Sequence, residues 1–254
     1  MNTKPLISVI TVVYNGVDFI EETIKSIINQ NYDNVEYILI DGGSTDGTVD
    51  IIKQYESKIA YWISEPDNGI SDAFNKGIKV SNGDYINFQG DGDGFVSLNV
   101  LDKVFEGVNP KEDALVSARI QRVDKDGCEL FTSKHIKNFR KKSLLFRMSL
   151  PHQGLFVHKS YFEKYGPFDI NNTFCMDYDH LLRSYGDFPK VVTKDVVVAR
   201  WRDDGLGSGR TKEVLEEYDR IKKENKVANG LTLKLINNWI LSKHYIKIFF
   251  KRST

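Results

Sequence analysis

Strand-like and helix-like stretches alternate through the first 110 residues, and this alternation limits the chain to few fold classes. Leu6 to Val13 is a continuous, mostly β-branched run, as expected for a strand buried on both faces. After Asp18, isoleucines recur at helical spacing up to residue 28. Further strands are expected at 35–40, 59–63 and 85–88, with helices near 46–55 and 71–80. Such βαβ units predict the α/β class, with a mostly parallel central sheet flanked by helices.

The second half of the chain is less regular. Strands are predicted as a hairpin at 114–122 and 129–132, and singly at 154–157 and 191–199. Helices are expected at 159–165, 176–185 and 211–227, and a glycine-rich loop at 200–210. We find no internal repeat and no low-complexity linker. The simplest division is one domain over residues 1–210 and a C-terminal helical extension over 211–254.

Charge and cysteine content exclude some functions. Lysine plus arginine and aspartate plus glutamate number 35 each, so no overall positive field would attract nucleic acid. Cys128 and Cys175 stand far apart, which indicates a reducing compartment and no disulfide framework. The N-terminus lacks a charged and then apolar signal sequence, and no run approaches 18 apolar residues. We therefore expect a cytoplasmic protein.

A pair of carboxylates follows the fourth expected strand. Asp91 and Asp93 are separated by one glycine in the segment QGDGDG. Open α/β sheets bind ligands at the carboxyl ends of their strands, and carboxylate oxygens suit Mg²⁺ and Mn²⁺. The pair therefore predicts a site for a divalent metal and a diphosphate. A calcium loop starting at Asp91 is excluded, because Phe95 and Val96 stand where an oxygen ligand and a glycine are needed.

Two more aspartates are expected at the same edge of the sheet. Asp41 ends the second strand, and Asp67 stands just beyond the third. Both belong to turn sequences, so capping or turn formation is an alternative explanation for each. The convergence of independent strand ends on one edge is a stronger indication of a site than any single motif.

Five segments together resemble the inverting glycosyltransferases of family 2, of the type that builds bacterial surface polysaccharides. The segments are ISVITVVYN (7–15), IDGGSTDGT (40–48), EPDNGI (65–70), the acidic pair, and DYDHLLR (177–183). The resemblance covers residues 5 to 210 and implies a GT-A fold. It also implies that a sugar nucleotide, usually a UDP-sugar, lies across the sheet edge. A divalent metal, Mn²⁺ or Mg²⁺, would bridge its diphosphate to the acidic pair.

The resemblance also assigns the nucleotide end of the site. Thr11, Val13 and Tyr14 would line the base pocket, although ordinary strand packing explains them equally well. Asp41 would accept hydrogen bonds from the uracil or the ribose. Asp67 would orient the nucleotide or a nearby lysine.

At the diphosphate, the resemblance favours Asp93 as the direct metal ligand. Asp91 would then contact the ribose or a metal-bound water. Many relatives carry a carboxylate where this chain has Gly92, which weakens the assignment of individual roles. Arg202, in the glycine-rich loop, would match the phosphate charge.

Transfer with inversion requires a base that takes the proton of the acceptor hydroxyl. Asp177 is the expected base, with Asp179 as the second candidate; relatives commonly carry Glu-Asp here, whereas this chain has Met176 first. The alternative is that both aspartates only stabilise a helix N-terminus. His152 and Gln153 resemble a loop on the acceptor side, although a buried structural histidine is equally compatible.

The last segment of the chain is basic. No acidic residue follows Glu224, whereas lysines and apolar residues alternate to Arg252. Lys243, Lys247 and Lys251 recur at a spacing of four, which predicts an amphipathic helix on an anionic membrane surface over 231–252. The alternative is a helix packed on the domain with its lysines in water.

The expected function is transfer of a sugar from a nucleotide-diphosphate sugar to a hydroxyl of a glycan or lipid-linked glycan, in surface-polysaccharide biosynthesis. A nucleotidyltransferase is one alternative, but Tyr14-Asn15-Gly16-Val17-Asp18 is not the basic, glycine-rich phosphate loop it would need. An inactive nucleotide-sugar-binding protein is the other, and the retained carboxylates argue against it.

Overall fold

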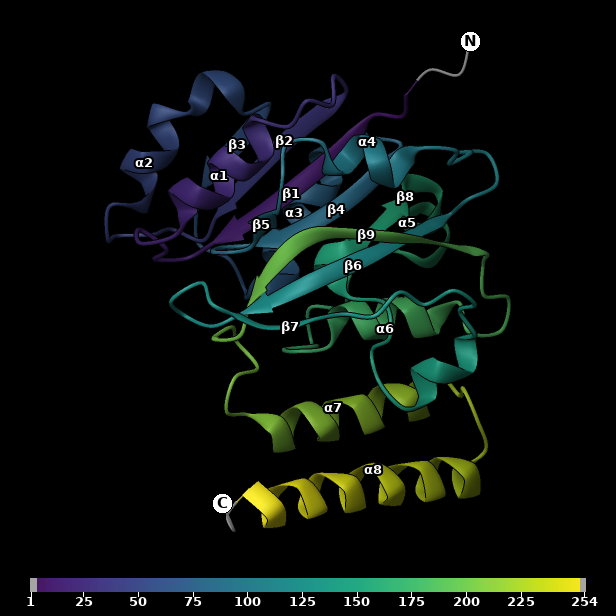
Figure 1. Cartoon of the computed structure of the whole chain (residues 1–254). Helices are drawn as coiled ribbons and strands as arrows, with labels where there is room; N and C mark the ends of the chain where they lie inside the picture. Colours follow the sequence, from purple (N-terminus) through teal and green to yellow (C-terminus); the bar gives the residue numbers. More distant parts are fainter. Residues whose placement is uncertain (1–3, 252–254) are drawn as a thin grey trace.

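The computed structural model describes residues 4–251 and contains one mixed sheet with helices on both faces (Figure 1). The strand order is β3-β2-β1-β4-β8-β6-β9-β5, and β7 pairs with β6. The strands are β1 (Ile7–Val13), β2 (Val35–Asp41), β3 (Tyr61–Ser64), β4 (Tyr85–Gly90), β5 (Gly94–Phe95), β6 (Leu115–Val123), β7 (Glu129–Thr132), β8 (Leu155–His158) and β9 (Val191–Arg202). The helices are α1 (Ile20–Ile28), α2 (Thr48–Gln54), α3 (Ile70–Val80), α4 (Val100–Phe105), α5 (Lys159–Tyr165), α6 (Met176–Arg183), α7 (Thr211–Glu224) and α8 (Gly230–Lys251).

The four N-terminal strands form the parallel part of the sheet. β1 pairs in parallel with β2 and β4, and β2 pairs in parallel with β3. All seven residues of β1 are buried, as its apolar sequence predicts. One apolar cluster lies between the sheet and α1, α2 and α4, and a second lies between the sheet and the other helices. The carboxyl ends of these strands therefore share one edge, which places their loops together.

The second half of the sheet is mixed rather than parallel. β8 runs antiparallel to β4 and β6, whereas β9 runs parallel to β6 and antiparallel to β5. The predicted loop at 200–210 begins too early, because β9 continues through Arg202. Strand β5 and helix α4 were not predicted. Gly94 pairs with Arg200 across more than 100 residues, and such pairing leaves no local sequence pattern.

The two C-terminal helices pack on the same face of the sheet as α6. Ile221 of α7 and Leu233 and Ile236 of α8 belong to the apolar cluster that includes Leu181 of α6. The segment predicted as an extension thus contributes to the core of the preceding residues, while the boundary at residue 210 stays a prediction. Across residues 4–251, no helix combines the length and the apolar character needed to span a membrane.

Candidate active site

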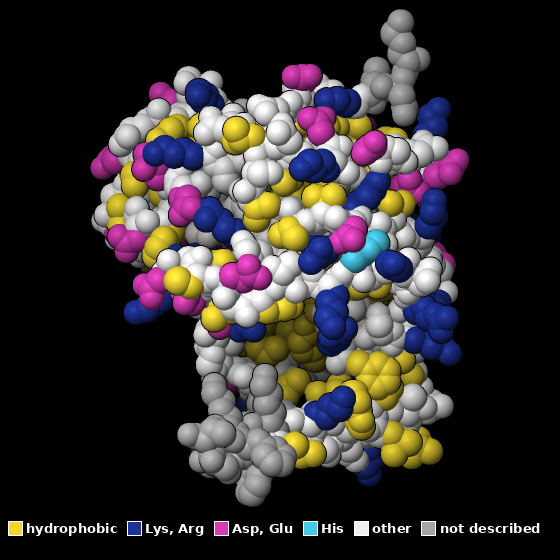
Figure 2. All heavy atoms as spheres, in the orientation of Figure 1, with side chains coloured by type: hydrophobic (Ala, Val, Ile, Leu, Met, Phe, Trp, Pro, Cys, Tyr) yellow, Lys and Arg dark blue, Asp and Glu magenta, His cyan; other side chains and the backbone are white. Residues whose placement is uncertain are grey.

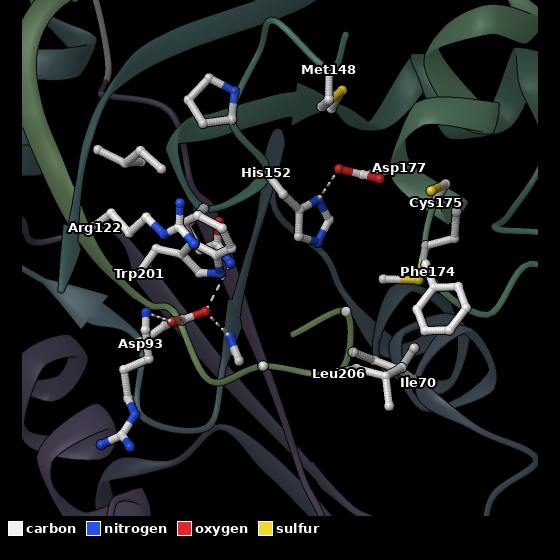
Figure 3. A pocket seen from close by; sticks show the side chains of 18 of the residues that line it. Ile70, Asp93, Arg122, Met148, His152, Phe174, Cys175, Asp177, Trp201 and Leu206 are labelled. Carbon is white, nitrogen blue, oxygen red and sulfur yellow. Dashed lines mark hydrogen bonds and ion pairs between the residues drawn. The ribbon is translucent and has the colours of Figure 1, made fainter. Parts of the chain in front are cut away.

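A large cavity begins at the carboxyl ends of β1 and β4 and reaches α6 and α7. Its volume is about 1820 Å³, above the roughly 300–1,000 Å³ that holds one small ligand. Figure 2 shows a hollow between the sheet and the C-terminal helices, with hydrophobic side chains on its walls. In Figure 3, Asp93 lies on one side of the cavity and Asp177 on the other. The cavity can accommodate a donor and an acceptor together.

The loops after β1 and β2 are tied together at one end of the cavity. The amide of Asn15 donates to Ser44 Oγ at 2.7 Å, and the amide of Thr45 donates to Asn15 Oδ1 at 2.9 Å. The amides of Gly16 and Val17 donate to side chains of the second loop in the same way. Asn15 has φ 52°, a conformation that asparagine tolerates better than most residues. These bonds fix the shape of the predicted nucleotide end.

Asp41 supports this end from below instead of facing the cavity. Its carboxylate is fully buried and accepts hydrogen bonds from the amides of Gly43 and Ser44 and from the hydroxyls of Ser44 and Ser64. Both oxygens therefore have protein partners, and Asp41 does not line the cavity. Asp41 thus holds the turn after β2, and its predicted contact with the uracil or the ribose stays a prediction.

Of the other residues predicted at the nucleotide end, one is buried away from the cavity and three line it. Thr11 is fully buried, and as an odd-numbered residue of β1 it faces the apolar cluster around α1, so it does not line the base pocket as predicted. Val13, Tyr14 and Asp67 do line the cavity. Tyr14 is 68% exposed, which leaves its ring free to stack on a base. Asp67 accepts the amide of Gly69 at 2.8 Å.

Asp93 is held in place by three hydrogen bonds. Its Oδ1 accepts the amide of Arg202 at 3.1 Å, and its Oδ2 accepts the amide of Gly90 at 3.1 Å and the side chain of Gln153 at 2.9 Å. Burial raises the pKa of Asp93 to about 6, and the hydrogen bonds oppose this shift. The orientation of this carboxylate is thus set by its own turn and by residues from two distant segments.

Asp91 lies beside it with far fewer partners. Its Oδ1 is buried and accepts no hydrogen bond. Burial raises the pKa of Asp91 to about 7, and the charge of Asp93 contributes to the shift. A buried carboxylate oxygen without a partner is costly unless a cation or a donor completes it.

These two carboxylates fit a divalent metal. Asp91 offers the oxygen without a partner, and Oδ1 of Asp93 keeps a second lone pair beyond the Arg202 amide. Within the described part of the chain, no three His, Cys, Asp or Glu side chains cluster to hold a metal. A metal here would therefore take its remaining ligands from diphosphate and water, as Mg²⁺ commonly does. The choice of Asp93 as first ligand stays a prediction.

Arg202 lines the cavity next to the acidic pair, and its contact with the diphosphate stays a prediction. Its guanidinium stacks on the ring of Phe19 at 3.5 Å and pairs with Asp204. Gly92 has φ 79°, and a Cβ there would lie 2.3 Å from Cδ of Arg202. The glycine between the two aspartates is therefore required by the position of this arginine, which explains why no carboxylate stands there.

The two aspartates at the start of α6 have different surroundings. Asp177 lines the cavity, and its Oδ1 accepts the amide of Tyr178 at 2.7 Å. Burial raises the pKa of Asp177, which suits a base. Asp179 does not line the cavity: its oxygens accept from Arg183 at 2.6 and 3.0 Å and from Asn225 at 2.8 Å. This ion pair with Arg183 favours Asp177 over Asp179 as the base, and the role of Asp179 as second candidate stays a prediction.

His152 and Gln153 both line the cavity, from a short 3₁₀ turn before β8. The His152 ring stacks on Phe88 with centroids 5.1 Å apart, and its Nδ1 lies 3.8 Å from Oδ2 of Asp177. Burial lowers the pKa of His152, so the imidazole stays neutral beside the aspartate. Gln153 reaches Asp93 instead, and so belongs to the acidic pair as well as to the acceptor side.

One functional residue of α7 was not predicted. Oε1 and Oε2 of Glu217 accept the amides of Thr173, Phe174 and Cys175 at 2.8 to 3.2 Å. These amides precede α6, so Glu217 fixes the loop that carries Asp177 into the cavity. Its position in a charged helix gave no local signal of this contact.

The fold and the site together define a glycosyltransferase with a GT-A fold: strand-end carboxylates at one side of a cavity face a further carboxylate on the other. The model of Glycosyl transferase family 2 matches residues 8–167, and the chain belongs to this family. It is a glycosyltransferase.

Several known proteins are similar to this chain. An uncharacterized glycosyltransferase of Mycobacterium tuberculosis (strain H37Rv) is 31% identical over 216 residues, 83% of this chain and 80% of the relative. A PGL/p-HBAD biosynthesis glycosyltransferase of Mycobacterium bovis is 26% identical over 92% of this chain and 91% of the relative. S. aureus TarS 1-349 in complex with UDP-GlcNAc has a similar fold, with a TM-score of 0.73, 16% identity and coverage of 94% and 72%. The mannosyltransferase PcManGT of Pyrobaculum calidifontis, in complex with GDP-Man and Mn²⁺, has a TM-score of 0.68, 17% identity and coverage of 100% and 76%.

Proposed function

We propose that this glycosyltransferase is metal-dependent and inverting, and moves a sugar from a UDP-sugar to a hydroxyl of a glycan or lipid-linked glycan used in surface-polysaccharide biosynthesis. The observation that carries the proposal is that Asp177 faces the same cavity as Asp91 and Asp93. One group can then take a proton while the opposite side of the cavity holds the leaving group.

In this proposal the donor lies with its base near Tyr14 and its diphosphate at the acidic pair. The acceptor oxygen attacks the anomeric carbon, and the bond from that carbon to the diphosphate oxygen breaks on the opposite side. Asp177 takes the proton of the hydroxyl, and the bonding electrons leave with the diphosphate. His152 lies beside this carboxylate, with Nδ1 3.8 Å from Oδ2 of Asp177, and burial favours its neutral form.

Asp91 and Asp93 would hold the metal, and Arg202 would lie beside the diphosphate. A divalent cation there offsets the charge that develops on the leaving diphosphate. The proposal is supported by the oxygen of Asp91 that lacks a partner, and by the complexes of neighbours of the same fold with UDP-GlcNAc and with GDP-Man and Mn²⁺.

Donor and metal are tested together by thermal unfolding with UDP-, GDP- and dTDP-sugars, each with and without Mn²⁺. A ligand at a hundred times its Kd stabilises the folded state by about 2.7 kcal/mol, which raises Tm by several degrees. We expect the largest shift with a UDP-sugar, and only when Mn²⁺ is present. No shift with any nucleotide-sugar would overturn the donor assignment.

Inversion is tested on the product. The configuration of the new glycosidic bond, read by NMR from the anomeric proton coupling, should be opposite to that of the donor. Retention of the donor configuration would contradict the role of Asp177 as the base of a single displacement.

We further propose that the protein works in the cytoplasm at the inner face of the cytoplasmic membrane, and that α8 contacts that surface. Leu231, Leu235, Trp239 and Ile246 are 48 to 72% exposed, and at 100° per residue they fall within an arc of about 80°. The buried Leu233 and Ile236 lie on another side of the helix, against the core. Of the predicted basic stripe, Lys243 is exposed, whereas the side chains of Lys247 and Lys251 lie outside those that the structure describes.

This membrane contact is tested with point variants, because truncation at residue 230 would also remove Leu233 and Ile236 from the core. Leu235→Ser with Trp239→Ser should reduce flotation with vesicles that contain anionic lipid. Leu98→Ser, an equally exposed leucine far from α8 in the sequence, should leave flotation unchanged. Equal flotation of the double variant and the unmodified protein would remove α8 from the proposal.

A further inference from the structure

The wall of the cavity beside Asp177 is apolar. It is formed by Ile70, Met148, Ile170, Phe174 and Leu206, which come from four separate segments, since Ile170 and Phe174 share the loop before α6. In Figure 3, Met148 and Phe174 lie near Asp177, and Ile70 and Leu206 lie together below Phe174, apart from Asp93. Ile170 and Leu206 are each 54% exposed, so the wall presents apolar surface to water. Covering such surface is favourable for a ligand with an apolar group.

Two buried polar side chains near this wall already have partners within the protein. Asn172 is buried; its Oδ1 accepts from Arg220 at 2.6 Å, and its carbonyl accepts from Ser71 at 2.9 Å. Ser149 is paired with Ser143 at 2.7 Å. A sugar hydroxyl buried against these two side chains would displace their hydrogen bonds or make none, which costs free energy. The wall therefore suits an apolar group better than a sugar.

The part of this wall around Phe174 is also held in one shape before any ligand binds. Glu217 fixes the backbone of Phe174 and its neighbours, and the guanidinium of Arg210 lies 4.6 Å from the centre of the Phe174 ring. An apolar surface held in this way needs little ordering on binding, so more of its contact free energy appears as affinity.

We propose that the acceptor carries an apolar aglycone, an alkyl chain or an aromatic ring, within a few atoms of the hydroxyl that receives the sugar. The aglycone lies against Ile170, Phe174 and Leu206 while Asp177 faces the hydroxyl. This inference rests on the proposed function, in which Asp177 is the base, and it narrows the acceptor class. The enzyme then adds a sugar close to an apolar anchor and not at the far end of a long polysaccharide.

The test compares octyl β-glucoside with methyl β-glucoside, which share one sugar and differ in the aglycone. Binding to the full chain is measured by calorimetry below the micelle concentration, with UDP and Mn²⁺ present. We expect the octyl glucoside to bind at least about tenfold more tightly, because each buried methylene contributes about 0.8 kcal/mol. The double variant Ile170→Ser, Leu206→Ser should lose most of this preference.

The matched control is the double variant Leu98→Ser, Leu235→Ser. These leucines are similarly exposed but do not line the cavity, and Leu235 tests capture of the octyl chain by α8. The control should keep the full preference. Equal binding of the two glucosides, or a preference that persists in the cavity variant, would overturn the aglycone site. Thermal unfolding with UDP-sugar and Mn²⁺, measured on the same proteins, separates the failure of this inference from that of the proposed function. If the unmodified protein shows no thermal shift with UDP-sugar and Mn²⁺, the donor assignment is contradicted and the aglycone site is not.

Discussion

Two pairs of aspartates have the same spacing in the sequence but differ in how many of their members line the cavity. Asp91 and Asp93 both line the cavity, whereas of Asp177 and Asp179 only the first does. The difference lies in the backbone that carries each pair. Residues 91 and 93 flank Gly92, whose φ of 79° turns the chain so that both carboxylates reach one side. Asp177 and Asp179 belong to a helix, where two positions correspond to about 200° of rotation. Spacing in sequence therefore predicts a shared site only where the backbone conformation is known.

The largest expected effect comes from the helical pair. Asp177→Asn removes the base, so the transfer rate should fall by roughly a thousandfold, within the 10²–10⁴ range of general-base catalysis, while UDP-sugar binding is unchanged. Asp179→Asn should keep most of the transfer rate but lower Tm, because Arg183 and Asn225 lose a charged partner worth about 1–3 kcal/mol. The transfer rate and the Tm of both variants are measured. An equal loss of transfer rate in Asp177→Asn and Asp179→Asn would contradict the assignment of different roles to the two aspartates.

Substitutions of the strand-end pair, Asp91 and Asp93, should differ in their effect on the stability of the metal-free protein. Asp91→Asn removes a charge that is buried without a partner, so the metal-free protein should be as stable as before or more so. Asp93→Asn disturbs the bonds to Gly90, Gln153 and Arg202, so its metal-free Tm should fall. Both should weaken Mn²⁺ binding in the presence of UDP by at least about tenfold. Calorimetry and thermal unfolding measure the two effects; a normal Mn²⁺ affinity in both variants would exclude the metal site.

A steric change can disturb the first pair without altering its charges. A Cβ on Gly16 would lie 2.2 Å from Oδ2 of Asp91, so Gly16→Ala should displace this carboxylate. We expect a loss of Mn²⁺-dependent UDP-sugar binding that is smaller than in Asp91→Asn, about three- to tenfold. Gly186→Ala is the control, since nothing lies within 4 Å of a Cβ there. If calorimetry gives the same Mn²⁺-dependent affinity for UDP-sugar in Gly16→Ala and Gly186→Ala, binding does not depend on the present position of Asp91.

The smallest expected effect is a pH dependence. Burial raises the pKa of Asp91 to about 7 and that of Asp93 to about 6, above their unfolded values. The folded, metal-free protein therefore binds protons more tightly than the unfolded chain, and the contribution of these groups to stability falls as pH rises from about 4 to 7. Metal requires the ionised forms, so the Tm shift caused by Mn²⁺ with UDP should grow between pH 5.5 and 8. A shift independent of pH in this range would contradict metal binding by these carboxylates.

Much of the fold was predictable because its signals are local. The apolar run of β1 and the isoleucine spacing of α1 each arise within one segment, and both elements lie where the sequence predicts them. The hairpin of β6 and β7 was likewise marked by its turn. Strand β5 was missed because its two residues are defined by pairing with β9, about 100 residues later.

The sequence by itself determined the parallel half of the sheet, the acidic pair at a strand end, and Asp177 as a candidate base, because periodicity and short motifs are properties of neighbouring residues. Only the tertiary structure decided that Asp41 and Thr11 are buried, that Asp179 is bound to Arg183, and that Glu217 fixes the loop before Asp177. It alone assembled an apolar wall from four segments beside Asp177. The physical reason is that burial, ion pairs and cavity walls depend on contacts between distant segments, which no local pattern records.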